Sequence, residues 1–171
     1  LLPRGDRQSL ALGIVHYSRE IAFAAAAIYA RAAEARGAWD SRIEATIVDA
    51  VVRAETDESV LSRASTLGWN TDSKVAVAIG GAPQDATVLD GLRRAATKLS
   101  LDVLAAPQGD RLVVIAGGSG VGDPVDTCER ISKLRDFFAD GPVVVGPTVD
   151  GLAGAPKSAR EAASGFRAAK A

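Results

Sequence analysis

The sequence has 171 residues, of which 47% are hydrophobic, 20 are basic and 21 are acidic. This length allows one well-buried core, and the composition excludes an intrinsically disordered chain. The net charge of −1 lacks the basic excess of a typical nucleic-acid-binding domain. The single cysteine, Cys128, excludes an internal disulfide and a cysteine-rich zinc site, and it fits a cytoplasmic location.

The first segment is predicted to be a long apolar helix. Large side chains recur at helical spacing at Leu10, Ile14, Tyr17, Ile21 and Ile28. Gly37 predicts a stop after Arg36. A helix this apolar needs a partner, either another helix of the chain or a second subunit, so we expect a homo-oligomer.

No membrane span is expected in this first segment. Its longest apolar run, from Ile21 to Ala30, is far shorter than the roughly 20 residues that a spanning helix needs. The sequence contains no methionine and begins at Leu1, which suggests a fragment of a longer protein.

Two shorter helices are expected next. Ser41 and Glu44 form a capping-box pattern, which predicts a new helix whose buried stripe is Ile43, Ile47, Val48 and Val51. Another helix is expected from Asp57 to Leu67, with Gly68 as its C-terminal break. Asp40, Asp57 and Asp85 are interpreted as helix caps.

From Ser73 onward the hydrophobic period changes to that of strands alternating with helices. Strands are expected at 74–79, 103–106, 111–116 and 143–145, and helices at 85–99, 124–139 and 157–169. The turn 107–110 predicts a hairpin. This β-α-β-β-α-β-α order favours an α+β fold of the ferredoxin-like type, with helices on one face of a four-stranded sheet.

The stretch Gly117–Gly122 resembles a phosphate-binding loop only superficially. Asp123 and Pro124 follow it, where a Walker loop requires lysine and then serine or threonine, and the Rossmann pattern is not met either. We interpret the stretch as a flexible connection between a strand and a helix. The basic residues Arg93, Arg94 and Lys98 are interpreted as a solvated helix face.

No set of residues predicts catalysis or metal binding. The only histidine, His16, is interpreted as a packed or interface residue, and Cys128 as a buried thiol. Asp123 and Asp126 suit a helix start, where carboxylates favour the free amides. Trp39 and Trp69 are interpreted as covers of the core, and the seam between the helical region and the sheet is the natural place for a ligand pocket.

The chain resembles the central domain of PucR/CdaR-type bacterial transcription regulators, a degenerate relative of GGDEF nucleotide cyclases. The resemblance covers roughly Trp39 to the end and depends on the hairpin, Leu67-Gly-Trp69, Val145-Gly-Pro-Thr148 and Ser158-Ala-Arg-Glu-Ala162. The segments 17–23 and 33–42 are similar to the actinobacterial branch that includes the mycobacterial regulator of mycolic acid biosynthesis.

This resemblance implies a regulator whose DNA-binding helix-turn-helix lies outside the present chain. Cyclases of this kind hold metal-binding carboxylates on the first strand and at the hairpin. Here the first strand reads Val75-Ala-Val-Ala-Ile79 and the hairpin retains only Asp110. One carboxylate does not suffice for the two cations of phosphoryl transfer, so no cyclase activity, catalytic residue or cofactor is expected.

The sequence therefore favours a non-catalytic regulatory module for self-association and effector sensing. The expected parts are a long helix at 1–38, connecting helices at 39–72 and a degenerate GGDEF-like domain at 73–171. By analogy with the lipid-biosynthesis branch, the effector is an acyl thioester such as an acyl-CoA. Two alternatives stay open, namely a nucleotide-binding or cyclase-like enzyme domain and a passive scaffold.

Overall fold

The computed structural model describes residues 4–171. Its internal contacts divide into two compact units, Leu1–Asp40 and Ser41–Ala171, which are described separately below. The three-part division at 1–38, 39–72 and 73–171 stays a prediction, and residues 1–3 of its first part lie outside the described residues.

The first helix does not end where the sequence predicted. Helix α1 (Arg4–Arg53) continues through Gly37, so both the stop at this glycine and the new start at Ser41 are wrong. A glycine inside a helix costs only about 1 kcal/mol relative to alanine, which the surrounding alanine-rich turns tolerate. The helix ends at Arg53, and the next residue, Ala54, has a φ of 61°, the left-handed geometry that commonly follows a helix C-terminus.

The acidic residues near helix starts have mixed outcomes. Asp57 caps helix α2 (Glu58–Thr66) by accepting a hydrogen bond from the Val60 amide, and Asp123 caps helix α4 (Pro124–Ser132) in the same way. Asp40 lies inside α1 and is therefore not a cap. Asp85 accepts a bond from the Thr87 amide in the turn before helix α3 (Val88–Lys98), which has no side-chain cap.

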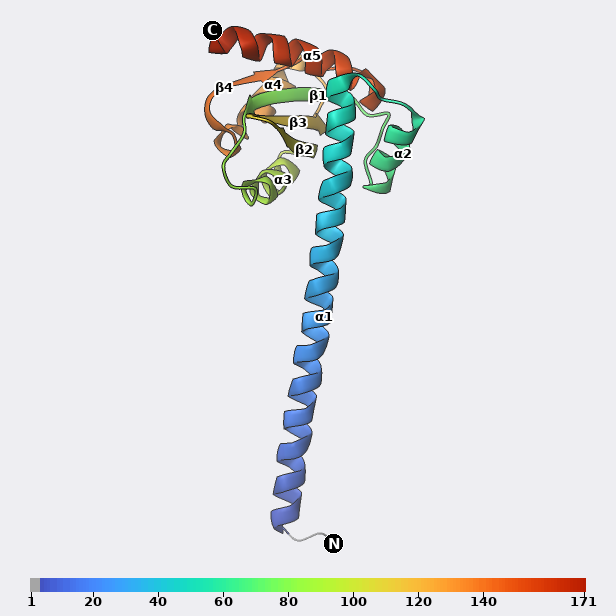
Figure 1. The fold of residues 1–171 in the computed structure, drawn as a ribbon, viewed down its shortest axis with the longest axis vertical. Coiled ribbons are helices and arrows are strands. Elements are labelled where there is room, and N and C mark those ends of the chain that lie inside the picture. The colour runs from blue at the N-terminus through green and yellow to red at the C-terminus, as the bar shows by residue number, and fades with distance from the viewer. Residues whose placement is uncertain (1–3) are drawn as a thin grey trace. The chain divides into compact units, whose positions relative to one another are not determined.

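Ser41–Ala171 contains one antiparallel sheet of four strands in the order β2-β3-β1-β4. The strands are β1 (Ala76–Gly81), β2 (Asp102–Gln108), β3 (Arg111–Gly117) and β4 (Ala139–Val145). Helix α3 connects β1 to β2 and α4 lies between β3 and β4, so two split βαβ units interlock (Figure 1). The expected α+β, ferredoxin-like fold is confirmed.

The predicted end of the helix at 124–139 and the predicted start of the helix at 157–169 are wrong. Helix α4 stops at Ser132, and a 3-10 turn (Arg135–Phe137) leads into β4, so Phe138 no longer belongs to a helix. Helix α5 (Gly151–Lys170) begins a turn and a half before Pro156. Pro156 removes only one intrahelical hydrogen bond, and the fully buried Leu152 and Ala155 stabilise the early turns by packing.

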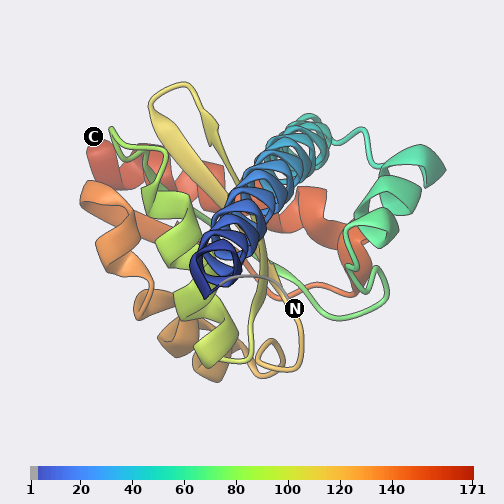
Figure 2. The ribbon, with the colours of Figure 1, turned by 90° about the horizontal axis from the view of Figure 1, so that it is seen from below.

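Helices cover both faces of the sheet, which corrects the expected one-sided arrangement. One face packs against α5, α2 and the C-terminal part of α1, and its core includes Val77, Ile115, Ile47 and Val51. The other face packs against α3 and α4 around Leu92. Figures 1 and 2 show α3 and α5 on opposite sides of the sheet. Alternate residues of each strand therefore enter two different cores.

Candidate functional site

The end of the first strand and the hairpin, the two places where the resemblance expects cyclase carboxylates, lie side by side in this fold. The end of β1 lies beside the hairpin tip, because Gly81 pairs with Arg111 and the Ala82 amide donates to the Asp110 carbonyl at 2.9 Å. A Cβ atom on Gly80 would lie 2.5 Å from the Phe138 ring. Phe138, which precedes β4, therefore fills the space that a side chain at Gly80 would need.

The remaining hairpin carboxylate is paired with a lysine. The Asp110 carboxylate accepts a hydrogen bond from Lys170 Nζ at 3.2 Å, and Arg111 Nε lies 3.9 Å away. The bond from Lys170 holds the pKa of Asp110 below its ordinary value of 3.8. Within residues 4–171, no group of three or more His, Cys, Asp or Glu side chains is arranged to hold a metal ion.

Close backbone packing accounts for the glycine-rich stretch 117–122. The Gly120 amide donates to the Ser100 carbonyl at 2.8 Å. A Cβ atom on Gly120 would lie 2.8 Å from the carbonyl oxygens of both Leu99 and Ser100, and one on Gly117 would lie 2.6 Å from the Trp69 ring. The stretch connects β3 to α4 as predicted, and its glycines allow contact with the chain before β2.

Several single-residue interpretations are wrong. Cys128 is exposed, because Thr127 and Ile131 occupy the inner face of α4. Trp39 is 56% exposed and covers no core within the chain, whereas Trp69 is 7% exposed and does. His16 is not packed within the chain, since its side chain is exposed and lies 3.5 Å from Glu20. The interface interpretation of His16 stays a prediction.

A buried ion pair joins α1, α3 and β2. The Glu44 side chain is 6% exposed, and its carboxylate accepts hydrogen bonds from Arg93 Nη2 at 2.5 Å and from the Ala105 amide at 2.6 Å. Arg93 also bonds Asp90 at 2.9 Å and is therefore only partly solvated, contrary to the interpretation from sequence. Sequence reasoning assigned Glu44 to a capping box and missed this role.

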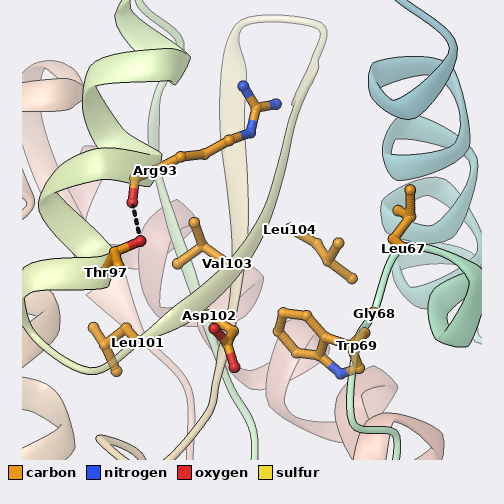
Figure 3. A pocket seen from close by; sticks show the side chains of 9 residues that line it. All are labelled: Leu67, Gly68, Trp69, Arg93, Thr97, Leu101, Asp102, Val103 and Leu104. Atoms are coloured by element: carbon orange, nitrogen blue, oxygen red, sulfur yellow. Dashed lines mark hydrogen bonds between the residues drawn. The ribbon is translucent and has the colours of Figure 1, made fainter. Parts of the chain in front are cut away.

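A small cavity lies close to this ion pair. It measures about 220 Å³ and is lined by the loop Leu67–Trp69, by Arg93 and Thr97 of α3, and by 101–104 at the start of β2 (Figure 3). The Thr97 hydroxyl donates to the Arg93 carbonyl at 3.0 Å. Trp69 Nε1 is buried without a hydrogen-bond partner, an arrangement that is rare in folded proteins.

The segment Arg4–Asp40 of α1 exposes large apolar side chains on two faces. At about 100° per residue, one set falls within about 60° of arc: Leu10, Ile14, Tyr17, Ile21 and Ile28, which are 51–68% exposed. We call this set the Leu10 seam. The opposite face carries Leu12, Val15 and Phe23, and Tyr29 lies between the two faces. No helix within residues 4–171 has the length and apolar character to cross a membrane.

The sequence model of the GGDEF-like domain family matches residues 53–168. The chain belongs to this family. The GGDEF-like domain thus includes α2, the whole sheet and nearly all of α5.

The chain is also similar to longer relatives and to a solved structure. Uncharacterised proteins of Mycobacterium tuberculosis and Mycobacterium bovis are 41% identical over 181 residues, covering 98% of this chain and 42% of each relative. The chain therefore spans less than half the length of these relatives. A regulator of polyketide synthase expression from Bifidobacterium adolescentis matches with a TM-score of 0.62 and 27% identity, covering 77% of this chain and 51% of that structure.

Proposed function

We propose that this GGDEF-like domain and its α1 helix form a non-catalytic regulatory module of a PucR/CdaR-type transcription regulator. The observation that carries the proposal is that the end of β1, Gly80-Gly81, lies beside a hairpin whose one carboxylate, Asp110, is paired with Lys170. The solved structure with a similar fold is a regulator of polyketide synthase expression, which supports a regulatory role.

The electrostatics of the hairpin argue against phosphoryl transfer. Two divalent cations need several carboxylate ligands, and the one acid at the tip, Asp110, is engaged by Lys170. Arg111 adds a second positive charge beside it. A metal ion at this place would meet cationic side chains and a single paired carboxylate.

Self-association is proposed to occur through the Leu10 seam. Its spacing of four and three residues, continued by Ala24, is the heptad repeat of a left-handed coiled coil. Five large apolar side chains that are more than half exposed form a continuous stripe. A second copy of the chain covers this stripe with an identical stripe, as a two-fold interface requires.

The remaining parts of the proposal follow the resemblance to the regulator family. The effector is an acyl thioester such as an acyl-CoA, and the regulated genes belong to lipid biosynthesis, as in the branch that controls mycolic acids. DNA binding resides in a helix-turn-helix domain of the longer protein, and the protein acts in the cytoplasm. The relatives are long enough to hold such a domain, since this chain covers 42% of them.

Two assays test the regulatory proposal against its rivals. Incubation of the chain with magnesium and GTP or ATP should give no cyclic product, and robust turnover would refute the non-catalytic assignment. A thermal-shift titration with acyl-CoA should raise the melting temperature, because a ligand that binds only the folded state stabilises it. An unchanged melting temperature with every acyl-CoA tested would favour a passive scaffold.

A further inference from the structure

Strand β2 forms one edge of the sheet, so its outer side has no partner strand within the described sheet. In an antiparallel pair, alternate residues direct both backbone polar groups toward the neighbouring strand or away from it. The Ala105 amide donates a hydrogen bond to the Glu44 carboxylate and not to β3. Ala105 is therefore one of the residues of β2 whose backbone groups face away from β3. Val103, Ala105 and Pro107 are therefore the residues whose backbone groups face outward.

Two of these three positions are protected against pairing. The Ala105 amide is occupied by the Glu44 carboxylate at 2.6 Å, and Pro107 has no amide hydrogen. Buried charge and proline are common means of blocking an exposed sheet edge. Val103 alone keeps both an outward amide and an outward carbonyl without a hydrogen-bond partner among the described residues.

The cavity of about 220 Å³ lies at this open position. Val103 lines it, together with Trp69 on one side and Thr97 on the other (Figure 3). The charge of Arg93 is balanced by Glu44 and Asp90, so the cavity offers no free cation for an anionic ligand. Its walls combine apolar surface with the outward amide and carbonyl of Val103, the Thr97 hydroxyl and the Asp102 carboxylate, which further disfavours an anionic ligand.

We propose that this cavity binds a small neutral molecule that carries an amide group next to an apolar group. The ligand carbonyl accepts from the Val103 amide, and the ligand N–H donates to the Val103 carbonyl. The apolar group lies against Trp69 and Leu104. A whole peptide strand is disfavoured, because only one residue of the edge is open and the cavity is below the usual 300–1,000 Å³ or so of drug-sized sites.

Nuclear magnetic resonance on the whole chain tests this site with N-acetyl-leucinamide as the probe. At roughly 0.3 kcal/mol per heavy atom, a probe of about 12 atoms should bind with a Kd of about 1–10 mM. The amide signal of Val103 and the indole signal of Trp69 should shift saturably. The indole of Trp39, which is 56% exposed and outside the cavity, should not shift and serves as an internal control.

Two variants on α3 make the test specific. Thr97→Phe places a ring in the cavity mouth and should abolish the saturable shifts. Lys98 is exposed and does not line the cavity, so Lys98→Phe should retain these shifts. Val103→Pro removes the outward amide at an edge position, where proline is tolerated, and should weaken binding at least about tenfold.

The proposal is wrong if the probe gives no saturable shift at Val103 in the wild-type chain, or if Thr97→Phe binds as well as Lys98→Phe. A pentapeptide that binds more tightly than the probe would also overturn it in favour of strand addition. These outcomes are independent of the regulatory role, because they concern binding to the GGDEF-like domain and neither self-association nor acyl-CoA.

Discussion

Replacement of Glu44 by alanine should strongly destabilise the GGDEF-like domain. The substitution leaves the Ala105 amide without its acceptor at a buried sheet edge and leaves Arg93 without its closest counter-charge. Breaking a buried ion pair costs about 3–5 kcal/mol. The Arg93 side chain is 31% exposed and retains its ion pair with Asp90 in the variant. We therefore expect the free energy of unfolding to fall by about 2–4 kcal/mol.

A graded series of variants separates the two hydrogen bonds of Glu44. Glu44→Gln keeps an oxygen acceptor for the Ala105 amide and loses only the charge, so it should cost about 1–2 kcal/mol. Glu161 is an exposed glutamate on α5, and Glu161→Ala should stay within about 0.5 kcal/mol of the wild type. The comparison therefore isolates the buried contacts from a general loss of negative charge.

Urea denaturation followed by circular dichroism measures these differences. With m values of about 1–3 kcal/mol/M, Glu44→Ala should lower the midpoint by about 1–2 M without changing the slope. If Glu44→Ala and Glu161→Ala had the same midpoint, the bridge between α1, α3 and β2 would not stabilise the domain. Equal losses for Glu44→Ala and Glu44→Gln would instead assign the whole effect to Arg93.

Three further predictions concern glycines and a surface ion pair. Gly120→Ala should cost about 1–3 kcal/mol in urea denaturation, because its Cβ would meet two carbonyl oxygens, whereas Gly122→Ala, with nothing within 4 Å, should not. Gly37→Ala should increase helical circular dichroism, since Gly37 lies inside a continuous helix, and a decrease would restore the predicted stop. The pKa of Asp110 is lowered by Lys170, so this pair stabilises the fold above pH 3.8, and the stability difference between wild type and Asp110→Asn should disappear as the pH falls through the lowered pKa.

Local chemistry made the order of elements predictable from the sequence. The apolar run of β1 and the turn residues at Gly109 and Asp110 act within a few residues, and they predict a strand and a hairpin directly. The Asp57 cap likewise depends on contacts three residues away. These signals sufficed for the ferredoxin-like order of strands.

Contacts between distant segments account for what the sequence could not predict. The partners of Glu44 lie 49 and 61 residues away, so its local pattern with Ser41 was interpreted as a capping box. Gly37 and Pro156 interrupt helices only weakly, and packing elsewhere in each helix overrides them. The seam between the helical region and the sheet was the expected place for a pocket, but the lining of the cavity at Trp69 comes from three separate segments that no local pattern singled out.

Sedimentation equilibrium of the purified chain tests the central claim, self-association of a non-catalytic module through the Leu10 seam. The wild-type chain should sediment as an oligomer at micromolar concentration. Ile14→Glu combined with Ile21→Glu should give a monomer, because each places a charge in the seam. Ala26→Glu, which adds a charge to the exposed far face of the same helix, should remain associated. A wild-type chain that is monomeric at high micromolar concentration would contradict the account.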